Sequence, residues 1–193
     1  MNIGTINGKT ITQILDEMVD KKIGIDLGTA GDGGSSLVEG RLFTGETVKF
    51  DGIYWLVAHI DYIKKYAYLC SSEIVTMTRF GNNNPYAGSI LANLAQQFEV
   101  SMSAAALSRM VDVEVNGVTA KVFVASYEQM NGGFSWFNNT QNRICNYGET
   151  PNTYWTSSPN SSSIVWSVYA GGGFYGSDPS TAGGFRPSIC LPL

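Results

Sequence analysis

The amino-acid sequence predicts an α+β fold built on antiparallel sheets, and three observations support this prediction. Segments rich in β-branched and aromatic residues follow residue 41, two short helical patterns come next, and many short strand candidates fill the last third. Strands and helices that are segregated along a chain are typical of α+β folds with antiparallel sheets. With 193 residues, 44% of them hydrophobic, the chain is long enough for one sizeable domain and a short additional segment.

Residues 1–40 differ in character from the rest of the chain and are predicted to form a docking segment. Thr10 and Gln13 fit a capping box, and apolar residues then recur at helical spacing until Gly24. The predicted helix has about 12 residues, a length that is marginal in isolation, so it needs a surface to pack against. The stretch GTAGDGGSS is then predicted to be a flexible hinge before a domain at residues 41–193.

The stretch IGIDLGTAGDGG, at residues 23–34, resembles the phosphate-binding turn of the actin-like and chaperone ATPases. Those ATPases are far longer, two-lobed proteins with further phosphate and adenosine motifs in the second half. This chain has no second motif of that kind and no Gly-x-x-x-x-Gly-Lys loop. We therefore interpret the stretch as part of the hinge and expect no nucleotide cofactor.

The first part of the domain is predicted to hold two strands and two helices. VKFDGIYWLVAHI (48–60) and YAYLC (66–70) predict antiparallel strands joined near residues 61–65, because both are rich in β-branched and aromatic residues. SILANLAQQF (89–98) carries apolar residues at helical spacing, and SAAALSRM (103–110) predicts a second short helix.

A hairpin and a loop-rich region follow. In VDVEVNGVTAKVFV, apolar residues alternate on both sides of Asn116-Gly117, a pair that favours a type I′ turn. The segments TYWTSS, IVWSVYA and FRPSICL are then predicted to be aromatic-rich strands between loops dense in Ser, Gly and Asn.

Composition excludes several classes of function. The net charge is −4 and the basic residues are scattered, so nucleic acid is not an expected partner. No apolar run approaches the roughly 20 residues that span a bilayer. The stretch MNIGTINGKT lacks the basic region and apolar core of a secretory signal, so export is not expected. Cys70, Cys145 and Cys190 are expected to be reduced and buried, as in a protein made in a cytoplasm. They form no metal motif with His59, the only histidine, so no metal is expected.

A resemblance to a known family lies in the last sixty residues or so. The strings SYEQM, GGFSWF, YWTSSP, VWSVYAGG and GGFRPSICL resemble the C-type-lectin-fold domains of bacterial prophage and tail proteins. The variable proteins of diversity-generating retroelements look most similar, and the formylglycine-generating enzymes share the wider fold. The resemblance covers about residues 42–193. It implies a C-type-lectin-like fold with antiparallel sheets, two short helices and long loops.

The resemblance and the residue types together assign structural roles. Large aromatic residues supply most of the buried area in a loop-rich fold, so four residues of the last strands are expected in the core: Trp155, Trp166, Val168 and Ile189. The resemblance implies that Arg186 fixes the last strand through hydrogen bonds to loop carbonyls.

The loops between residues 146 and 180 have the composition of a binding surface. More than half of the residues are Asn, Ser, Gly or Tyr, and only Glu149 and Asp178 are charged. Tyr gives rigid contact area and the small polar residues give adaptable hydrogen bonds. The same composition fits adenine-directed diversification, and it also fits an ordinary set of exposed loops. We predict that Tyr169, Phe174 and Tyr175 face a ligand. The predicted polar neighbours are Asn152, Asn160, Ser161, Ser163, Ser167 and Ser177.

Catalytic and metal chemistry lack supporting motifs. The nearest string to a calcium-lectin loop is GETPNT, in which Thr150 separates Glu149 from Pro151, so calcium-dependent sugar binding is not expected. Cys145 and Cys190 do not match the copper-binding cysteines of the formylglycine-generating enzymes. No Gly-x-Ser-x-Gly elbow is present, and His59 lies in a predicted strand.

Together these observations favour a non-enzymatic phage or prophage virion protein made in the cytoplasm of a bacterial host. Residues 1–40 would attach it to other virion subunits or to its own copies, with a trimer expected by analogy with viral fibres. The C-type-lectin-like domain would bind a protein or glycan of the bacterial surface. The alternative is a capsid decoration or head-fibre protein without a dedicated ligand, and a third reading is a copper-dependent oxidase-like enzyme with reactive thiols.

Overall fold

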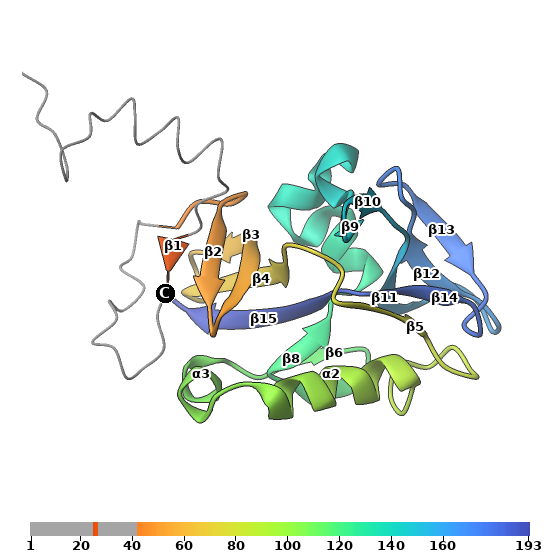
Figure 1. Cartoon of the computed structure of the whole chain (residues 1–193), viewed down its shortest axis with the longest axis horizontal. Helices are drawn as coiled ribbons and strands as arrows, with labels where there is room; N and C mark the ends of the chain where they lie inside the picture. Colours follow the sequence, from red (N-terminus) through yellow and green to blue (C-terminus); the bar gives the residue numbers. More distant parts are fainter. Residues whose placement is uncertain (1–24, 27–41) are drawn as a thin grey trace, which may run out of the picture.

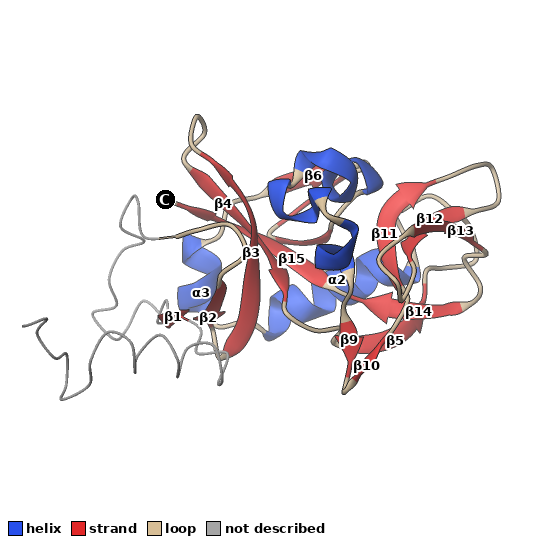
Figure 2. Cartoon of the chain, turned by 90° about the horizontal axis from the view of Figure 1, so that it is seen from above, coloured by secondary structure: helices blue, strands red, loops and turns tan. Residues whose placement is uncertain are grey.

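The computed structural model of the chain describes residues 25–26 and 42–193, so the predicted N-terminal helix lies outside the described residues. Within the described part the fold is α+β, as predicted. Two large, mostly antiparallel sheets are joined end to end, and helical segments cover both sides of the junction (Figures 1 and 2).

The first sheet has six strands in the order β1-β2-β3-β4-β15-β8. Every neighbouring pair is antiparallel except β1 and β2. The last strand of the chain, β15, therefore lies between two strands that come much earlier in the sequence. The bounds are β1 Ile25–Asp26, β2 Thr47–Phe50, β3 Ile53–Asp61, β4 Tyr66–Ser71, β8 Val122–Val124 and β15 Pro187–Pro192.

Two details of this sheet differ from the sequence interpretation. The segment predicted as one strand at 48–60 is two strands, because Asp51 and Gly52 have φ angles of 51° and 77° and form a tight hairpin turn. Residues 25–26, which we had placed in the hinge, pair with Val48 and Lys49 at the edge of the sheet.

The second sheet has five strands in the order β13-β12-β11-β14-β5. Only β11 and β14 run parallel. Two small hairpins complete the β structure, and in one of them Asn116 and Gly117 adopt the positive φ angles of a type I′ turn, 48° and 79°, as predicted. The bounds are β5 Thr76–Arg79, β11 Tyr154–Pro159, β12 Val165–Val168, β13 Phe174–Ser177, β14 Ala182–Phe185, β6 Val113–Val115, β7 Val118–Ala120, β9 Asn146–Tyr147 and β10 Thr150–Pro151.

The two predicted helices are present, and each begins at a serine cap. The side chain of Ser89 accepts from the Ala92 N–H at the start of α2 (Ile90–Ser101), and Ser103 caps α3 (Ala104–Arg109) in the same way. Three short helical turns follow later and form what we call the helical insert: η1 Gln129–Gly133, η2 Ser135–Asn138 and η3 Thr140–Arg143. No helix in the described part of the chain is long and apolar enough to cross a membrane.

The six-stranded sheet has a separate apolar core on each side. Helix α2 lies along one side, where Val57 and Leu69 pack in the same cluster as Leu91 (Figure 1). The helical insert lies on the other side, where the adjacent residues Ala58 and Cys70 share a cluster with aromatic residues of the insert. This alternation follows from the two-residue period of a strand.

Arg186 lies where the chain passes directly from the five-stranded sheet to the six-stranded sheet. Strand β14 ends at Phe185 and β15 begins at Pro187, so the chain passes from one sheet to the other at Arg186. Its Nε donates to the Ser71 carbonyl (3.0 Å), and its Nη1 donates to the Tyr154 hydroxyl (2.9 Å). The guanidinium also lies 5.2 Å from the centre of the Phe137 ring. The bond to a carbonyl agrees with the role implied by the resemblance, and the tyrosine partner was not foreseen.

We predict that removing the Tyr86 hydroxyl destabilises the fold. The side chain is 2% exposed and its oxygen accepts the backbone N–H of Val124 (3.2 Å), while burial raises the pKa of Tyr86 to about 12. In Tyr86→Phe that N–H is left buried without a partner, which should lower the free energy of unfolding by about 1–3 kcal/mol. Urea unfolding measures this loss. The control is Tyr147→Phe, at a half-exposed position, and equal stability of the two variants would contradict the prediction.

Candidate functional site

The hairpin of β12 and β13 carries all three aromatic residues predicted to face a ligand, and it forms the free edge of the five-stranded sheet (Figures 1 and 2). Val168 pairs with Phe174, and Ser167 pairs with Tyr175. Because side chains alternate along a strand, Phe174 points to one side of the hairpin and Tyr175 to the other.

The side that carries Phe174 packs on the domain. Tyr127 stacks on Trp166 with ring centres 4.6 Å apart and meets Phe174 edge to face at 4.7 Å. Phe174 and Trp166 are each only partly exposed. Such aromatic contacts stabilise a surface hairpin beyond the area that they bury. Phe174 thus anchors the hairpin, and Trp166 is at the margin of the core and not inside it.

The turn of the hairpin fits against the helical insert. Tyr169 accepts the N–H of Gly172 and donates to the carbonyl of Gly173, each at 2.7 Å. Gly172 has a φ of +83°, and a Cβ at this position would lie 2.0 Å from the Thr140 carbonyl oxygen. Only glycine allows both this backbone conformation and this close approach.

Arg143 holds the turn in place. Its Nε donates to the Gly172 carbonyl (2.7 Å), its Nη1 to the Phe137 carbonyl (2.6 Å) and its Nη2 to the Thr140 hydroxyl (2.9 Å). The guanidinium lies 4.7 Å from the centre of the Phe174 ring, and the side chain is 7% exposed. Sequence analysis missed this residue, since its partners in the hairpin are 29 residues away and no local pattern marks them.

Tyr169 and Tyr175 remain available to a ligand. Their exposed fractions are 60% and 65%. Tyr175 lies opposite Ser167. Tyr169 directly follows β12, two residues after Ser167, and its backbone pairs with Gly173, so the two tyrosines are diagonal neighbours on one side of the hairpin. The ring of Tyr169 also lies over Gly171. Two exposed aromatic rings on a well-anchored hairpin form a small platform, which we call the tyrosine platform.

The predicted polar neighbours divide into different environments. Ser167 is fully buried, and its hydroxyl contacts the Ser177 hydroxyl (2.8 Å) and the Tyr175 carbonyl (3.1 Å), so it supports the hairpin from within. Asn152 precedes β11 and lies toward the turn, where its Oδ1 accepts the N–H of Thr153.

Three others belong to the loop that joins β11 to β12, at the opposite end of the hairpin: Asn160, Ser161 and Ser163. They are exposed, and Asn160 lies against Gly176. The three residue steps of β12 separate the two ends by about 10 Å. The structure therefore gathers only part of the predicted set around the tyrosine platform.

The three cysteines are enclosed in the domain. All three cysteines are buried and free, and burial raises the pKa of Cys190 to about 12, so its thiol stays protonated at neutral pH. Burial also raises the pKa of Cys70 and of Cys145. Within residues 25–26 and 42–193, no group of three or more His, Cys, Asp and Glu side chains could hold a metal ion.

His59 has a structural environment. Its ring stacks on Tyr68 and on Phe134, with ring centres 6.1 and 6.0 Å away, and these two rings also contact each other at 5.2 Å, so the three rings form a triangle. The Nδ1 of His59 is 3.3 Å from the Ser135 hydroxyl. It thereby connects strand β3 to the helical insert.

Comparisons with known proteins give no further assignment. A scan against protein-family models found no match, and a search of the curated proteins found no significant relative.

We predict that Gly172→Ala disrupts the turn far more than a matched substitution elsewhere. A Cβ at Gly172 would collide with the Thr140 backbone. Gly148 also has a positive φ, +63°, but a Cβ there would have no atom within 4 Å. Gly148→Ala should therefore lose only about 1–2 kcal/mol of stability through backbone strain. Gly172→Ala should lose about 1–3 kcal/mol more, because of overpacking. Equal losses, measured by urea unfolding, would contradict this contact.

We predict that His59 makes the fold less stable in mild acid. Burial lowers the pKa of His59, although Asp61 opposes the shift. The unfolded chain, with the ordinary pKa of about 6.5, then binds the proton more readily, so stability should fall as the pH drops through about 6.5 toward the lower folded-state pKa. His59→Gln should remove this contribution. The free energy of unfolding of both proteins, measured between pH 8 and pH 5 (about the range where histidine titrates), tests it. Parallel curves would contradict the prediction.

Proposed function

We propose that this chain is a non-enzymatic binding protein of a phage or prophage particle, with a C-type-lectin-like domain that presents the tyrosine platform to the bacterial surface. The proposal rests on one observation, that two exposed tyrosine side chains lie on a hairpin that is firmly anchored to the domain. Tyr169 and Tyr175 are more than half exposed, while Arg143, Gly172 and Phe174 anchor the same hairpin.

The energetics of recognition favour such an arrangement. Tyrosine has few rotatable bonds, so a tyrosine on an anchored hairpin loses little conformational entropy when it binds. Its ring can stack on the apolar face of a sugar or on a protein side chain, and its hydroxyl can form a hydrogen bond. The net charge of −4 opposes simple electrostatic attachment to an anionic cell wall, so stacking and hydrogen bonds are proposed to carry specificity.

The ends of the molecule support a division between docking and binding. Strand β1 lies beside β2 at one end of the long axis, and β13 lies at the other end (Figure 1). A chain that is attached through residues 1–40, which include β1, would hold the tyrosine platform away from its attachment point. We propose that this segment docks on other virion subunits or on sister copies, in a trimer. Many copies on one particle would raise a weak single-site affinity by orders of magnitude.

The proposal predicts strain-selective binding to bacterial cells. The fluorescently labelled, multimerised full chain is incubated with a panel of bacterial strains, beside the double variant Tyr169→Ala/Tyr175→Ala. Phe174 is left unchanged because it is packed. We expect the double variant to lose at least about tenfold in apparent affinity, because contact tyrosines contribute about 1–2 kcal/mol each or more.

The matched control is Tyr62→Ala, which removes an equally exposed tyrosine (62%) from the turn between β3 and β4. Loss of binding in the control as well would point to a different surface. A well-folded multimer that binds no strain would overturn the proposal and favour the capsid decoration role.

Diversification by a retroelement is a separate proposal with a separate test. It requires, near the gene, a near-copy of the DNA that encodes the C-terminal segment, with adenines at the codons that vary, and a reverse transcriptase. Sequencing of the neighbouring DNA decides it. Without these features, the Asn, Ser, Gly and Tyr content of the loops is a property of exposed loops alone.

A further inference from the structure

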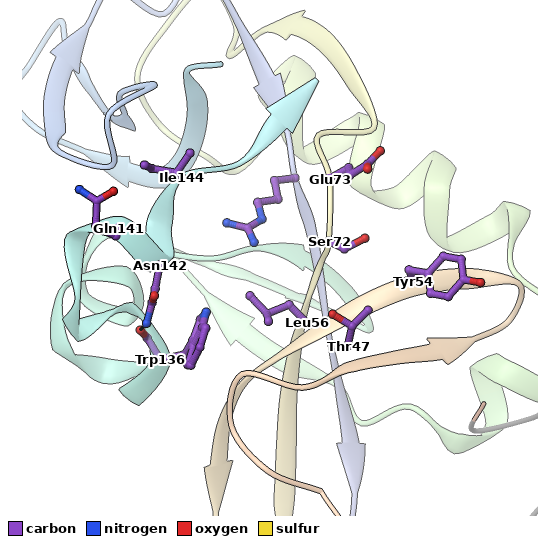
Figure 3. A pocket seen from close by; sticks show the side chains of 10 residues that line it. Thr47, Tyr54, Leu56, Ser72, Glu73, Trp136, Gln141, Asn142 and Ile144 are labelled. Carbon is purple, nitrogen blue, oxygen red and sulfur yellow. Dashed lines mark hydrogen bonds between the residues drawn. The ribbon is translucent and has the colours of Figure 1, made fainter. Parts of the chain in front are cut away.

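A pocket of about 570 Å³ lies between the helical insert and the start of the six-stranded sheet (Figure 3). Its volume falls within the range of about 300–1,000 Å³ that is typical of small-molecule sites. One wall comes from the insert and the segment after it, and the other from β2, β3 and the segment after β4. The lining residues labelled in Figure 3 are Trp136, Gln141, Asn142 and Ile144 on one side and Thr47, Tyr54, Leu56, Ser72 and Glu73 on the other.

Arg186 is the remaining lining residue, and it brings an uncompensated positive charge to the pocket. Its side chain is 4% exposed. Nε and Nη1 are engaged by Ser71 and Tyr154, but Nη2 forms no hydrogen bond and the guanidinium forms no ion pair with any residue in the described ranges. No side-chain nitrogen or oxygen of the described residues is both buried and without a hydrogen-bond partner. Because Nη2 has no partner, it must reach the accessible space of the pocket that Arg186 lines. Of the five N–H donors of this nearly buried cation, two are engaged by Ser71 and Tyr154, and both N–H groups of Nη2 remain for a ligand.

The charges around the pocket select the kind of anion. Among the described residues of the lining, Arg186 is the only basic one and Glu73 is the only acidic one. A ligand with one negative charge can pair with Arg186 and be held away from Glu73. A dianion such as a phosphate ester would bring a second charge that no cation neutralises, and Glu73 would repel it.

The remaining walls of the pocket suit the uncharged, polar part of a small ligand. The indole of Trp136 offers an apolar face, and it lies so close to Gly45 that a Cβ there would be 2.3 Å from the ring. The Asn142 side-chain nitrogen already donates to the Trp136 carbonyl (2.9 Å), which leaves its oxygen to accept from a ligand. Ser72, Thr47 and Gln141 add hydroxyl and amide groups.

We propose that this pocket binds a small molecule that carries a single carboxylate on a hydroxyl- or amide-rich body, with the carboxylate on Nη2 of Arg186 and the body against Trp136. Sugar acids and N-acylated amino acids share this chemistry. Charge-assisted hydrogen bonds to a desolvated guanidinium are strong and short, so the carboxylate is the group that decides affinity. Neither Tyr169 nor Tyr175 is among the described residues that line this pocket.

Matched ligand pairs test the carboxylate. Titration calorimetry with the full chain compares glucuronate with glucose, and N-acetylalanine with N-acetylalanine amide. We expect the acid of at least one pair to bind at least about tenfold more tightly than its neutral analogue. The pair that shows the difference identifies the source of the carboxylate. Glucose 6-phosphate should bind more weakly than glucuronate. Equal binding within both pairs, or no binding of either acid up to about 10 mM, would overturn the proposal.

Variants of the walls test the location without disturbing Arg186, which the fold needs. Trp136→Leu should weaken the binding of the acid by at least about fivefold, since it removes the aromatic face against which the uncharged part of the ligand packs. Glu73→Gln should strengthen the binding of glucose 6-phosphate more than that of glucuronate, since repulsion of a dianion is twice that of a monoanion.

Tyr169→Ala is the control and should leave the affinity for each of these small ligands unchanged. Its loss of binding to bacterial cells is measured in the separate cell-binding experiment. A correctly folded Trp136→Leu protein that binds the acid as tightly as the unaltered chain would overturn the assignment of this pocket.

Discussion

A chain of three buried residues, Arg186, Tyr154 and Arg143, connects the two sheets, the helical insert and the β12–β13 hairpin. Arg186 donates to Ser71 at the end of β4 and to the Tyr154 hydroxyl at the start of β11, and that hydroxyl in turn donates to the Arg143 carbonyl (2.7 Å). Arg143 then bonds to the helical insert and to the Gly172 turn. The two sheets, the insert and the hairpin are thereby fixed relative to one another by one continuous network. Such networks stabilise most when every member is satisfied.

Both buried guanidinium groups are held by carbonyls, hydroxyls and aromatic rings, and neither is paired with a carboxylate of the described residues. Arginine stays charged at any pH that a protein survives, so this network does not titrate. Burial raises the pKa of Tyr154, which keeps its hydroxyl as a donor in alkaline solution as well. The cost of desolvating Arg186 is offset by the Phe137 and Tyr154 faces, and truncation of either arginine would leave several buried acceptors without a donor.

Local chemistry was readable from the sequence, and long-range contacts were not. The serine caps of α2 and α3 and the Asn116-Gly117 turn follow from residue types within a few positions, and the α+β order follows from where the patterns fall. Asp51-Gly52 is the same kind of turn-forming pair, but it lies inside an apolar run, and for that reason the sequence was interpreted as one strand across it. Arg186 meets a partner 115 residues away, and the walls of the pocket come from segments far apart in the chain, so no window of sequence contains either.

The central position of β15 has a consequence for how the domain forms. Its residues pair with β4 on one side and with β8 on the other, and the contact between Ser188 and Cys70 joins residues 118 apart in sequence. Closing so long a loop before the contact is gained favours slow folding. During synthesis, the edges of β4 and β8 that will pair with β15 stay unpaired until β15 emerges. The nascent domain is therefore most exposed to edge-to-edge aggregation just before β15 is made.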